Sequence, residues 1–275
     1  MTMTRRFALA ALAIAALAGC ATVPTAPAGP VEQVVAITTP DGTQQAVWLH
    51  PAGRGPWPAV VVLPDITALR PAFVEVGRKL AGQGYAVLVP NTFYRSAALD
   101  GSTGPGTLTA AQSADRLNTW RAAASDDGVA RDAVATMAWL DARPEVDRRR
   151  KAGVIGYNVG GAHAFRYAAA VPGRVGAVAV LHPLGVATAR PNSPHLLVPQ
   201  AKAAWFVALA KPDDDREPGD KDDLRKAFAD AGQAGTVTVY PAGHGFAVAD
   251  NAAFDAAQES AAWGQVLALL ARALR

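Results

Sequence analysis

The segment Gly156-Tyr157-Asn158-Val159-Gly160-Gly161 decides the fold of this chain. It follows the apolar run Val154-Ile155, which is typical of a buried strand, and it leads into an alanine-rich segment that predicts a helix. Glycines in this spacing at a strand-to-helix junction form the frame of a nucleophile elbow, G-x-Nuc-x-G, because a side chain at either glycine would collide with nearby backbone. Residue 158 then occupies the apex of a tight turn, and that residue is an asparagine.

On both sides of this turn, short β-branched runs alternate with longer helical patterns. The expected strands are 34–39, 44–50, 59–63, 86–89, 152–157, 177–181, 204–210 and 236–240, and the expected helices are 71–83, 129–142, 161–170, 221–231 and 252–273. This alternation predicts a single doubly wound α/β domain over residues 34–275, with a mostly parallel sheet of seven or eight strands. Ligands of such sheets bind at the carboxyl edge, so we expect a pocket above Asn158, lined in part by the segment 96–127.

Composition and charge exclude several classes of protein. The chain has 275 residues, of which 51% are hydrophobic and 18% are charged, so it can bury a large core and is not disordered. The formal net charge is only +3. The densest basic run, Arg148-Arg149-Arg150-Lys151, falls at an expected helix-to-strand connection, so we predict a solvated loop and no nucleic-acid partner.

The first residues predict export. Arg5 and Arg6 precede an apolar stretch over 7–18, which is short for a bilayer span, and Leu17-Ala18-Gly19-Cys20 follows with the pattern of a lipobox. Residues 1–19 are therefore expected to be a lipoprotein signal peptide, and Cys20, the only cysteine, to be acylated and to hold the protein on a membrane. A free thiol after an ordinary secretory signal is the alternative.

Two further features bear on the expected location. The residue after the cysteine is Ala21. An aspartate at this position is associated with retention in the inner membrane, so the alanine favours the periplasmic face of an outer membrane. Residues 20–33, rich in proline and alanine, are expected to form a tether between the anchor and the domain.

Several segments of the predicted domain resemble the dienelactone hydrolase family of α/β-hydrolases. They are 58–66 (PAVVVLPDI), 80–91 (LAGQGYAVLVPN) with Phe93-Tyr94-Arg95, His182-Pro183 with Ser193-Pro194-His195, Ala210-Lys211-Pro212-Asp213, and 240–246 (YPAGHGF). Each match is weak alone, but their order and spacing together are specific. The resemblance implies an α/β-hydrolase fold and hydrolysis of small carboxylic esters or lactones, without a cofactor or a metal.

The resemblance also implies roles for individual residues. His244 would be the general base and Asp213 the carboxylate that orients it, with Asp214 as the alternative acid. The backbone N–H groups of Ile66 and Val159 would form the oxyanion hole.

A substrate carboxylate would bind Arg95, with Asp65 and Tyr94 beside it. For Arg95, an ion pair with a nearby carboxylate of the protein is equally open.

The sequence departs from the family at Asn158, where the family has its nucleophilic cysteine. A carboxamide has no acidic proton to give to histidine, and its nitrogen lone pair is delocalised, so it cannot form an acyl-enzyme. Direct activation of water by His244 remains possible. Deamidation of Asn158 is hindered by Val159, Tyr157 is expected to point away from the pocket, and His163 lies past the turn.

The other conspicuous polar residues also have structural interpretations. His50, His163, His182 and His195 lack the spacing of metal ligands, so we expect them to belong to the scaffold or the pocket rim. The acidic run 213–215 could be a solvated turn, and His244 could be structural.

Two functions follow from the sequence. The first is a membrane-anchored, dienelactone hydrolase-like protein that acts on small esters or lactones weakly, or by a water-based route. The second is a non-catalytic protein that binds an ester, lactone or carboxylate in the retained pocket or serves as a scaffold.

Overall fold

The computed structural model describes residues 29–96, 115, 118–119 and 122–275. The expected signal peptide, Cys20 and most of the expected tether lie outside the described residues, as does most of the segment 96–127. No helix among the described residues has both the length and the apolar character needed to cross a bilayer.

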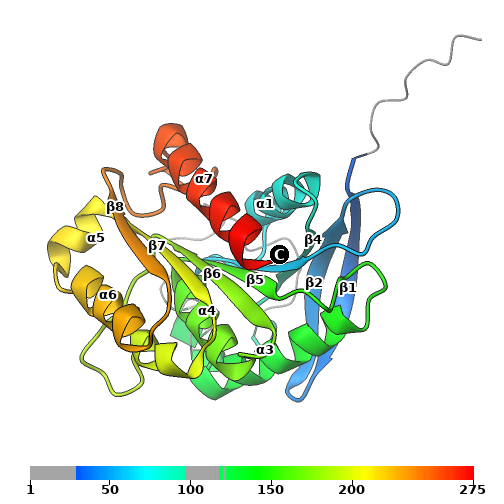
Figure 1. The fold of residues 1–275 in the computed structure, drawn as a ribbon, viewed down its shortest axis with the longest axis horizontal. Coiled ribbons are helices and arrows are strands. Elements are labelled where there is room, and N and C mark those ends of the chain that lie inside the picture. The colour runs from blue at the N-terminus through cyan, green and yellow to red at the C-terminus, as the bar shows by residue number, and fades with distance from the viewer. Residues whose placement is uncertain (1–28, 97–114, 116–117, 120–121) are drawn as a thin grey trace, which may run out of the picture.

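Within these residues, one sheet of eight strands organises the fold (Figure 1), and its order is β1-β2-β4-β3-β5-β6-β7-β8. All strands run parallel except β2, which pairs antiparallel with β1 and β4. The fold is the predicted single-domain α/β-hydrolase fold. The strands are β1 Val31–Thr39, β2 Gly42–His50, β3 Ala59–Leu63, β4 Ala86–Pro90, β5 Ala152–Tyr157, β6 Val175–Leu181, β7 Ala204–Ala210 and β8 Gly235–Tyr240.

Helices cover both faces of this sheet (Figure 1). Side chains alternate along each strand, so β5 presents Val154 to the face covered by α3, α4 and α6, and Ile155 to the face covered by α1 and α7. Two apolar cores result, and both lie within residues 37–274. The helices are α1 Pro71–Gly82, α3 Asp126–Asp141, α4 Val159–Ala170, the 3-10 helix η1 Pro194–Gln200, α5 Lys211–Arg216, α6 Asp220–Asp230 and α7 Ala256–Ala273.

The predicted strands and helices are present with altered ends, while the short helices η1 and α5 were not predicted. β1 begins at Val31, inside the expected tether, because its first residues pair with the end of β2. α4 begins directly after Asn158. α7 begins later than expected, at Ala256, because the Asp255 side chain accepts hydrogen bonds from the N–H groups of residues 257 and 258.

Candidate active site

The turn between β5 and α4 is held in a conformation that most side chains avoid. Asn158 has φ 50° and ψ −114°, and asparagine tolerates positive φ better than most residues. A Cβ atom at Gly156 would collide with the carbonyl of Gly160, and one at Gly160 would collide with the carbonyls of Leu63 and Pro64. The first turn of α4 therefore packs directly on the backbone of β5 and of the segment after β3, and this packing fixes the position of residue 158.

Asn158 faces the histidine that the sequence analysis singled out. Its Nδ2 lies 2.8 Å from His244 Nε2, and His244 Nδ1 lies 2.7 Å from Asp213 Oδ2. An ionised carboxylate can only accept, so His244 Nδ1–H donates to Asp213 and the Nε2 lone pair accepts an N–H of the Asn158 amide. The arrangement has the geometry of a catalytic triad whose nucleophile has been replaced by an amide.

The acid in this arrangement is Asp213, and Asp214 is turned to another partner. Asp213 lies in α5 after β7, and its second oxygen accepts a hydrogen bond from Arg216 at 2.7 Å. Asp214 Oδ1 instead pairs with Lys221 Nζ at 2.7 Å. The residues of the acidic run belong to a short helix and not to the solvated turn that was considered.

Two residues of the pocket around Asn158 carry backbone N–H groups that are candidates for an oxyanion hole. Ile66 and Val159 both line the pocket that contains Asn158 and His244. Neither N–H has an acceptor among the described residues; for Val159, the reason is its place at the first position of α4. These N–H groups and the partial positive charge of the helix N-terminus can stabilise a negative oxygen.

The pocket has a volume of about 690 Å³, and one face of α4 forms much of its wall. Val159, Ala162, His163 and Arg166 line it, in the i, i+3, i+4, i+7 spacing that places residues on one helix face. Further lining residues come from the described end of the segment 96–127, namely residues 124–126, and from the loop that contains Arg190. This size suits a small organic ligand.

His163 lies in α4, past the turn, and lines the pocket, in keeping with the expected place in the scaffold or the pocket rim. Its side chain is buried beside Phe93, and its Nδ1 has no hydrogen-bond partner in the described part of the chain. Burial, together with the nearby charge of Arg166, lowers the pKa of His163 to about 4. The ring is therefore neutral at neutral pH.

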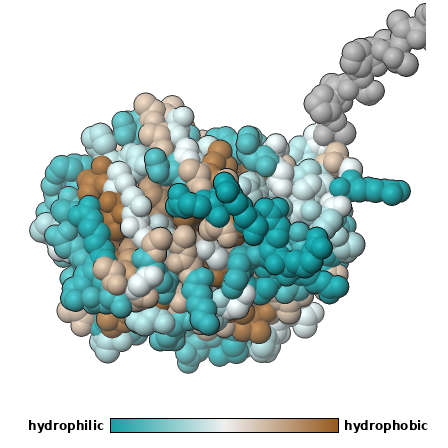
Figure 2. Space-filling view, viewed as in Figure 1, coloured by the Kyte–Doolittle hydropathy of each residue, from teal (hydrophilic) through white to brown (hydrophobic). Residues whose placement is uncertain are grey.

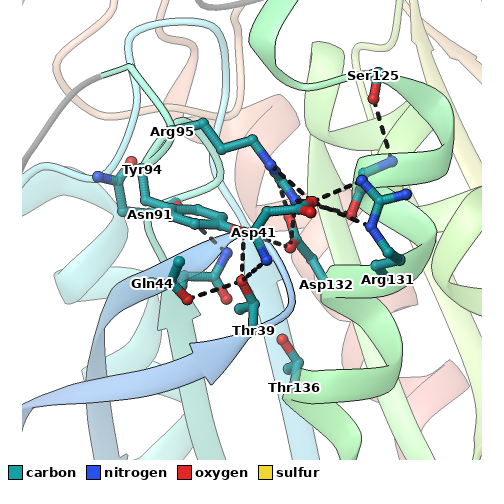
Figure 3. Close-up of polar contacts among 12 residues, drawn as sticks. Thr39, Asp41, Gln44, Asn91, Tyr94, Arg95, Ser125, Arg131, Asp132 and Thr136 are labelled. Carbon is teal, nitrogen blue, oxygen red and sulfur yellow. Dashed lines mark hydrogen bonds and ion pairs between the residues drawn. The ribbon is translucent and has the colours of Figure 1, made fainter.

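The three residues expected to contact substrate are bound to the protein itself. Arg95 pairs with Asp41 at 2.6 Å and with the buried Asp132 at 2.8 Å, and the Tyr94 hydroxyl lies 2.9 Å from Asp132 (Figure 3). Burial lowers the pKa of Arg95, but hydrogen bonds to the two carboxylates outweigh it and leave the pKa above its ordinary value. Of the two interpretations of Arg95, the geometry supports the ion pair.

Asp65 is likewise engaged within the protein, next to the proposed oxyanion donor. Its carboxylate pairs with Arg70 at 2.7 Å and accepts hydrogen bonds from the backbone N–H and the hydroxyl of Thr67. Because these contacts bracket Ile66, Asp65 shapes the turn that presents the Ile66 N–H. It does not line the pocket.

The remaining histidines belong to the scaffold. His50 stacks on Trp57, and His195 lies 2.8 Å from the Ser193 hydroxyl. His182 is buried with its ring edge-to-face against His244, and burial lowers its pKa to about 4. Within the described ranges, no three His, Cys, Asp or Glu side chains gather closely enough to hold a metal ion.

Comparison with known proteins identifies the family. The model of the dienelactone hydrolase family matches residues 45–274. The chain belongs to the dienelactone hydrolase family. It is similar to a carboxymethylenebutenolidase of Rhodococcus opacus, with 29% identity over 209 residues that cover 74% of this chain and 77% of that protein. A carboxymethylenebutenolidase of Pseudomonas sp. (strain P51) is 32% identical over 139 residues, which cover 49% of this chain and 54% of that protein.

Solved structures share the fold of this dienelactone hydrolase family member. A dienelactone hydrolase candidate from Klebsiella pneumoniae subsp. pneumoniae superposes with a TM-score of 0.77 at 20% identity, over 89% of this chain and all of that chain. A dienelactone hydrolase-like promiscuous phosphotriesterase from metagenomic libraries superposes with a TM-score of 0.72 at 20% identity, over 90% of this chain and all of that chain. Whole chains of this fold thus correspond to about nine tenths of the present one, and both apolar cores lie in residues 37–274.

Proposed function

We propose that this domain binds small carboxylic esters or lactones and hydrolyses them slowly by a water-based route, without an acyl-enzyme. One observation carries the proposal: His244 keeps a carboxylate partner, Asp213, at 2.7 Å, although the residue at its Nε2 atom is an amide that cannot act as a nucleophile. Asp213 orients the imidazole, and the same pocket is lined by Ile66 and Val159, whose N–H groups have no acceptor among the described residues.

In the proposed reaction, water replaces the nucleophile. A water molecule beside His244 gives a proton to Nε2 while its oxygen attacks the ester carbonyl, and the carbonyl oxygen becomes an oxyanion bound by the Ile66 and Val159 N–H groups. The imidazolium then returns the proton to the leaving alkoxide as the carbon–oxygen bond breaks, which yields acid and alcohol. Because Nε2 must first release the Asn158 amide, the step is slow.

The substrate class follows from the pocket and from the family. The pocket suits a small ester or lactone, and two cationic side chains, Arg166 and Arg190, line its wall. Arg166 pairs with Asp126, whereas Arg190 is exposed and has no ion pair among the described residues. Arg190 is therefore the group we assign to a substrate carboxylate, in place of Arg95.

Hydrolysis assays with matched variants test this function. The native protein, His244→Ala, Asn158→Ala and Asn158→Cys are compared on p-nitrophenyl acetate and on an unsaturated lactone. We expect native turnover above that of His244→Ala without a pre-steady-state burst. The turnover of Asn158→Cys should be at least about 10²-fold higher than that of the native protein, with a pre-steady-state burst, because a thiol beside His244 restores the covalent route.

A second function, ligand binding without catalysis, is favoured by the same amide contact, because it occupies the lone pair that a general base needs. In that case the native protein and His244→Ala hydrolyse equally slowly, while Asn158→Cys still gains activity. That result would reject the water-based hydrolase and leave a binding protein.

We also propose that the protein is a lipoprotein, anchored through Cys20 on the periplasmic side of a membrane, in keeping with an outer membrane. The pattern Leu17-Ala18-Gly19-Cys20 after an apolar stretch supports this. Metabolic labelling with a palmitate analogue should depend on Cys20. Equal labelling of Cys20→Ser would contradict the proposal.

A further inference from the structure

The described chain begins at the edge of the sheet opposite the pocket. Val31, the first residue of β1, pairs with His50 at the end of β2, and in turn Leu49 pairs with Val87 at the beginning of β4. The beginning of β1 therefore lies at the amino edge of the parallel strands. Asn158 and His244 follow the ends of β5 and β8, at the carboxyl edge.

Basic side chains gather at this same amino edge. They precede the parallel strands or lie at the end of α7, whose Ala273 carbonyl adjoins Gly176 and Lys151. We define the basic edge as Arg54 before β3, Arg148, Arg149, Arg150 and Lys151 before β5, Arg174 before β6, Lys202 before β7, and Arg272 and Arg275 at the C-terminus. Figure 2 shows hydrophilic residues gathered in the part of the view where Figure 1 places the C-terminus and the connection into β5.

Few acidic groups neutralise the basic edge within the described part of the chain. Asp141 pairs with Arg174, Asp147 pairs with Arg149, Glu32 at the beginning of β1 pairs with Arg78, and one Glu145 oxygen is buried. Burial lowers the pKa of Lys151, and the nearby charges of Lys202 and Arg174 lower it further, as expected where cations lie close together. Arg54, Arg148, Lys202 and Arg272 are exposed to solvent.

We propose that the basic edge docks on an anionic phospholipid surface, with the pocket facing away from it. Clustered Lys and Arg are attracted to anionic lipids when they lie within a few ångströms of the surface. β1 begins at this edge and Cys20 precedes it in the sequence, so the anchor proposed above would attach to the domain beside the basic edge. The basic run lies in a turn and not on a helix that could enter a nucleic-acid groove.

Vesicle binding tests this proposal independently of acylation and of hydrolysis. The protein beginning at Ala21, which lacks the acylated cysteine, is sedimented with vesicles of phosphatidylcholine containing roughly 30% phosphatidylglycerol, and with pure phosphatidylcholine. We expect binding to the anionic vesicles only, and its loss as salt rises from about 0.05 M to about 0.5 M, because added salt screens the charges. Arg148→Glu/Arg149→Glu should weaken the binding at least about tenfold.

Arg225→Glu/Lys226→Glu on α6 is the matched control. Like Arg149, both residues are exposed and form local ion pairs, so the charge change is the same at a different place. This control should bind anionic vesicles within about twofold of the native protein. Equal binding to both kinds of vesicle, equal loss in the two double variants, or tighter binding to a short DNA duplex than to anionic vesicles would each overturn the proposal.

Discussion

Asn158 Nδ2 lies 2.8 Å from His244 Nε2, the distance of a hydrogen bond in which the amide donates to the imidazole. The substitution has therefore replaced the nucleophile without displacing the base. The base keeps its carboxylate partner at 2.7 Å, and the N–H groups of the two candidate oxyanion donors have no acceptor in the part of the chain that the structure describes. This retained geometry is the basis for the predictions that concern activity.

Asp213, and not Asp214, should be the acid that supports His244. In an Asn158→Cys background, Asp213→Asn should lower kcat on p-nitrophenyl acetate by about 10²- to 10⁴-fold, because an amide favours the wrong imidazole tautomer. Asp214 pairs with Lys221 instead of His244. The kcat of the Asp214→Asn variant should therefore stay within about threefold of that of the Asn158→Cys parent. Steady-state kinetics measure both, and equal losses would contradict the assignment.

Arg190 should select for carboxylate-bearing substrates. In the Asn158→Cys background, Arg190→Ala should raise KM about two- to fivefold for an ester that carries a free carboxylate, since an exposed ion pair contributes about 0.2–1 kcal/mol. KM for a neutral ester of the same size should not change. A parallel rise for both esters would show that Arg190 acts only through the shape of the pocket.

Arg95 should stabilise the fold and leave substrate binding unchanged. Arg95→Met leaves the charge of Asp132, whose side chain is 3% exposed, without its cation, so the free energy of unfolding should fall by about 3–5 kcal/mol. Arg131→Met is the control: its half-exposed side chain pairs with the same Asp41, and its loss should leave the free energy of unfolding nearly unchanged because solvent screens this pair. Urea denaturation measures both, and similar losses would contradict the distinction.

Buried neutral histidines should make the fold sensitive to acid. The pKa values of His163 and His182 are about 4, below the ordinary value of 6.5, so between these pH values the unfolded chain binds protons that the folded chain does not. The free energy of unfolding should therefore fall as the pH drops from about 6.5 to about 4, by roughly 1–3 kcal/mol for each histidine.

The variant His182→Asn tests this origin of the acid sensitivity. It removes one titrating ring, and asparagine tolerates the positive φ of residue 182. The slope of stability against pH should be smaller in this variant than in the native protein. An unchanged slope would assign the acid sensitivity to other groups.

Gly160 should tolerate no side chain, because an added Cβ would collide with backbone carbonyls of Leu63 and Pro64. Gly160→Ala should lower the free energy of unfolding by more than about 2 kcal/mol. Gly264 is the control, since it is an exposed position within α7 and has open space around it. Gly264→Ala should stabilise by about 0.5–1 kcal/mol, and thermal unfolding compares the two.

Much of the fold could be predicted from the sequence because its signals are local. The apolar strand runs and the Gly156–Gly161 turn each depend on neighbouring residues, and these gave the α/β architecture and the position of Asn158. The helix α5 was missed because Lys211-Pro212-Asp213-Asp214-Asp215-Arg216 is short and polar, with no apolar period to reveal it.

The site was predictable where its residues follow strand ends, and not where it depends on distant partners. Asn158, Asp213 and His244 each follow a strand, so the topology brings them together at one edge of the sheet. Arg95 pairs with Asp41 and Asp132, and no local pattern indicates that contact. The place of His163 at the pocket was open in the sequence and follows from the helix, because His163 lies one turn after Val159 on the same face of α4.

The packing of Gly156 and Gly160 has a consequence for protein engineering. Close backbone packing at these two glycines fixes the path of the chain through residue 158. The position of the side chain at 158 therefore depends on this packing and not on which residue is present. Thiol, hydroxyl or carboxylate side chains could be exchanged there without rebuilding the surroundings. The backbone conformation at residue 158 is thus set by packing of the fold and not by the chemistry of the side chain at this position.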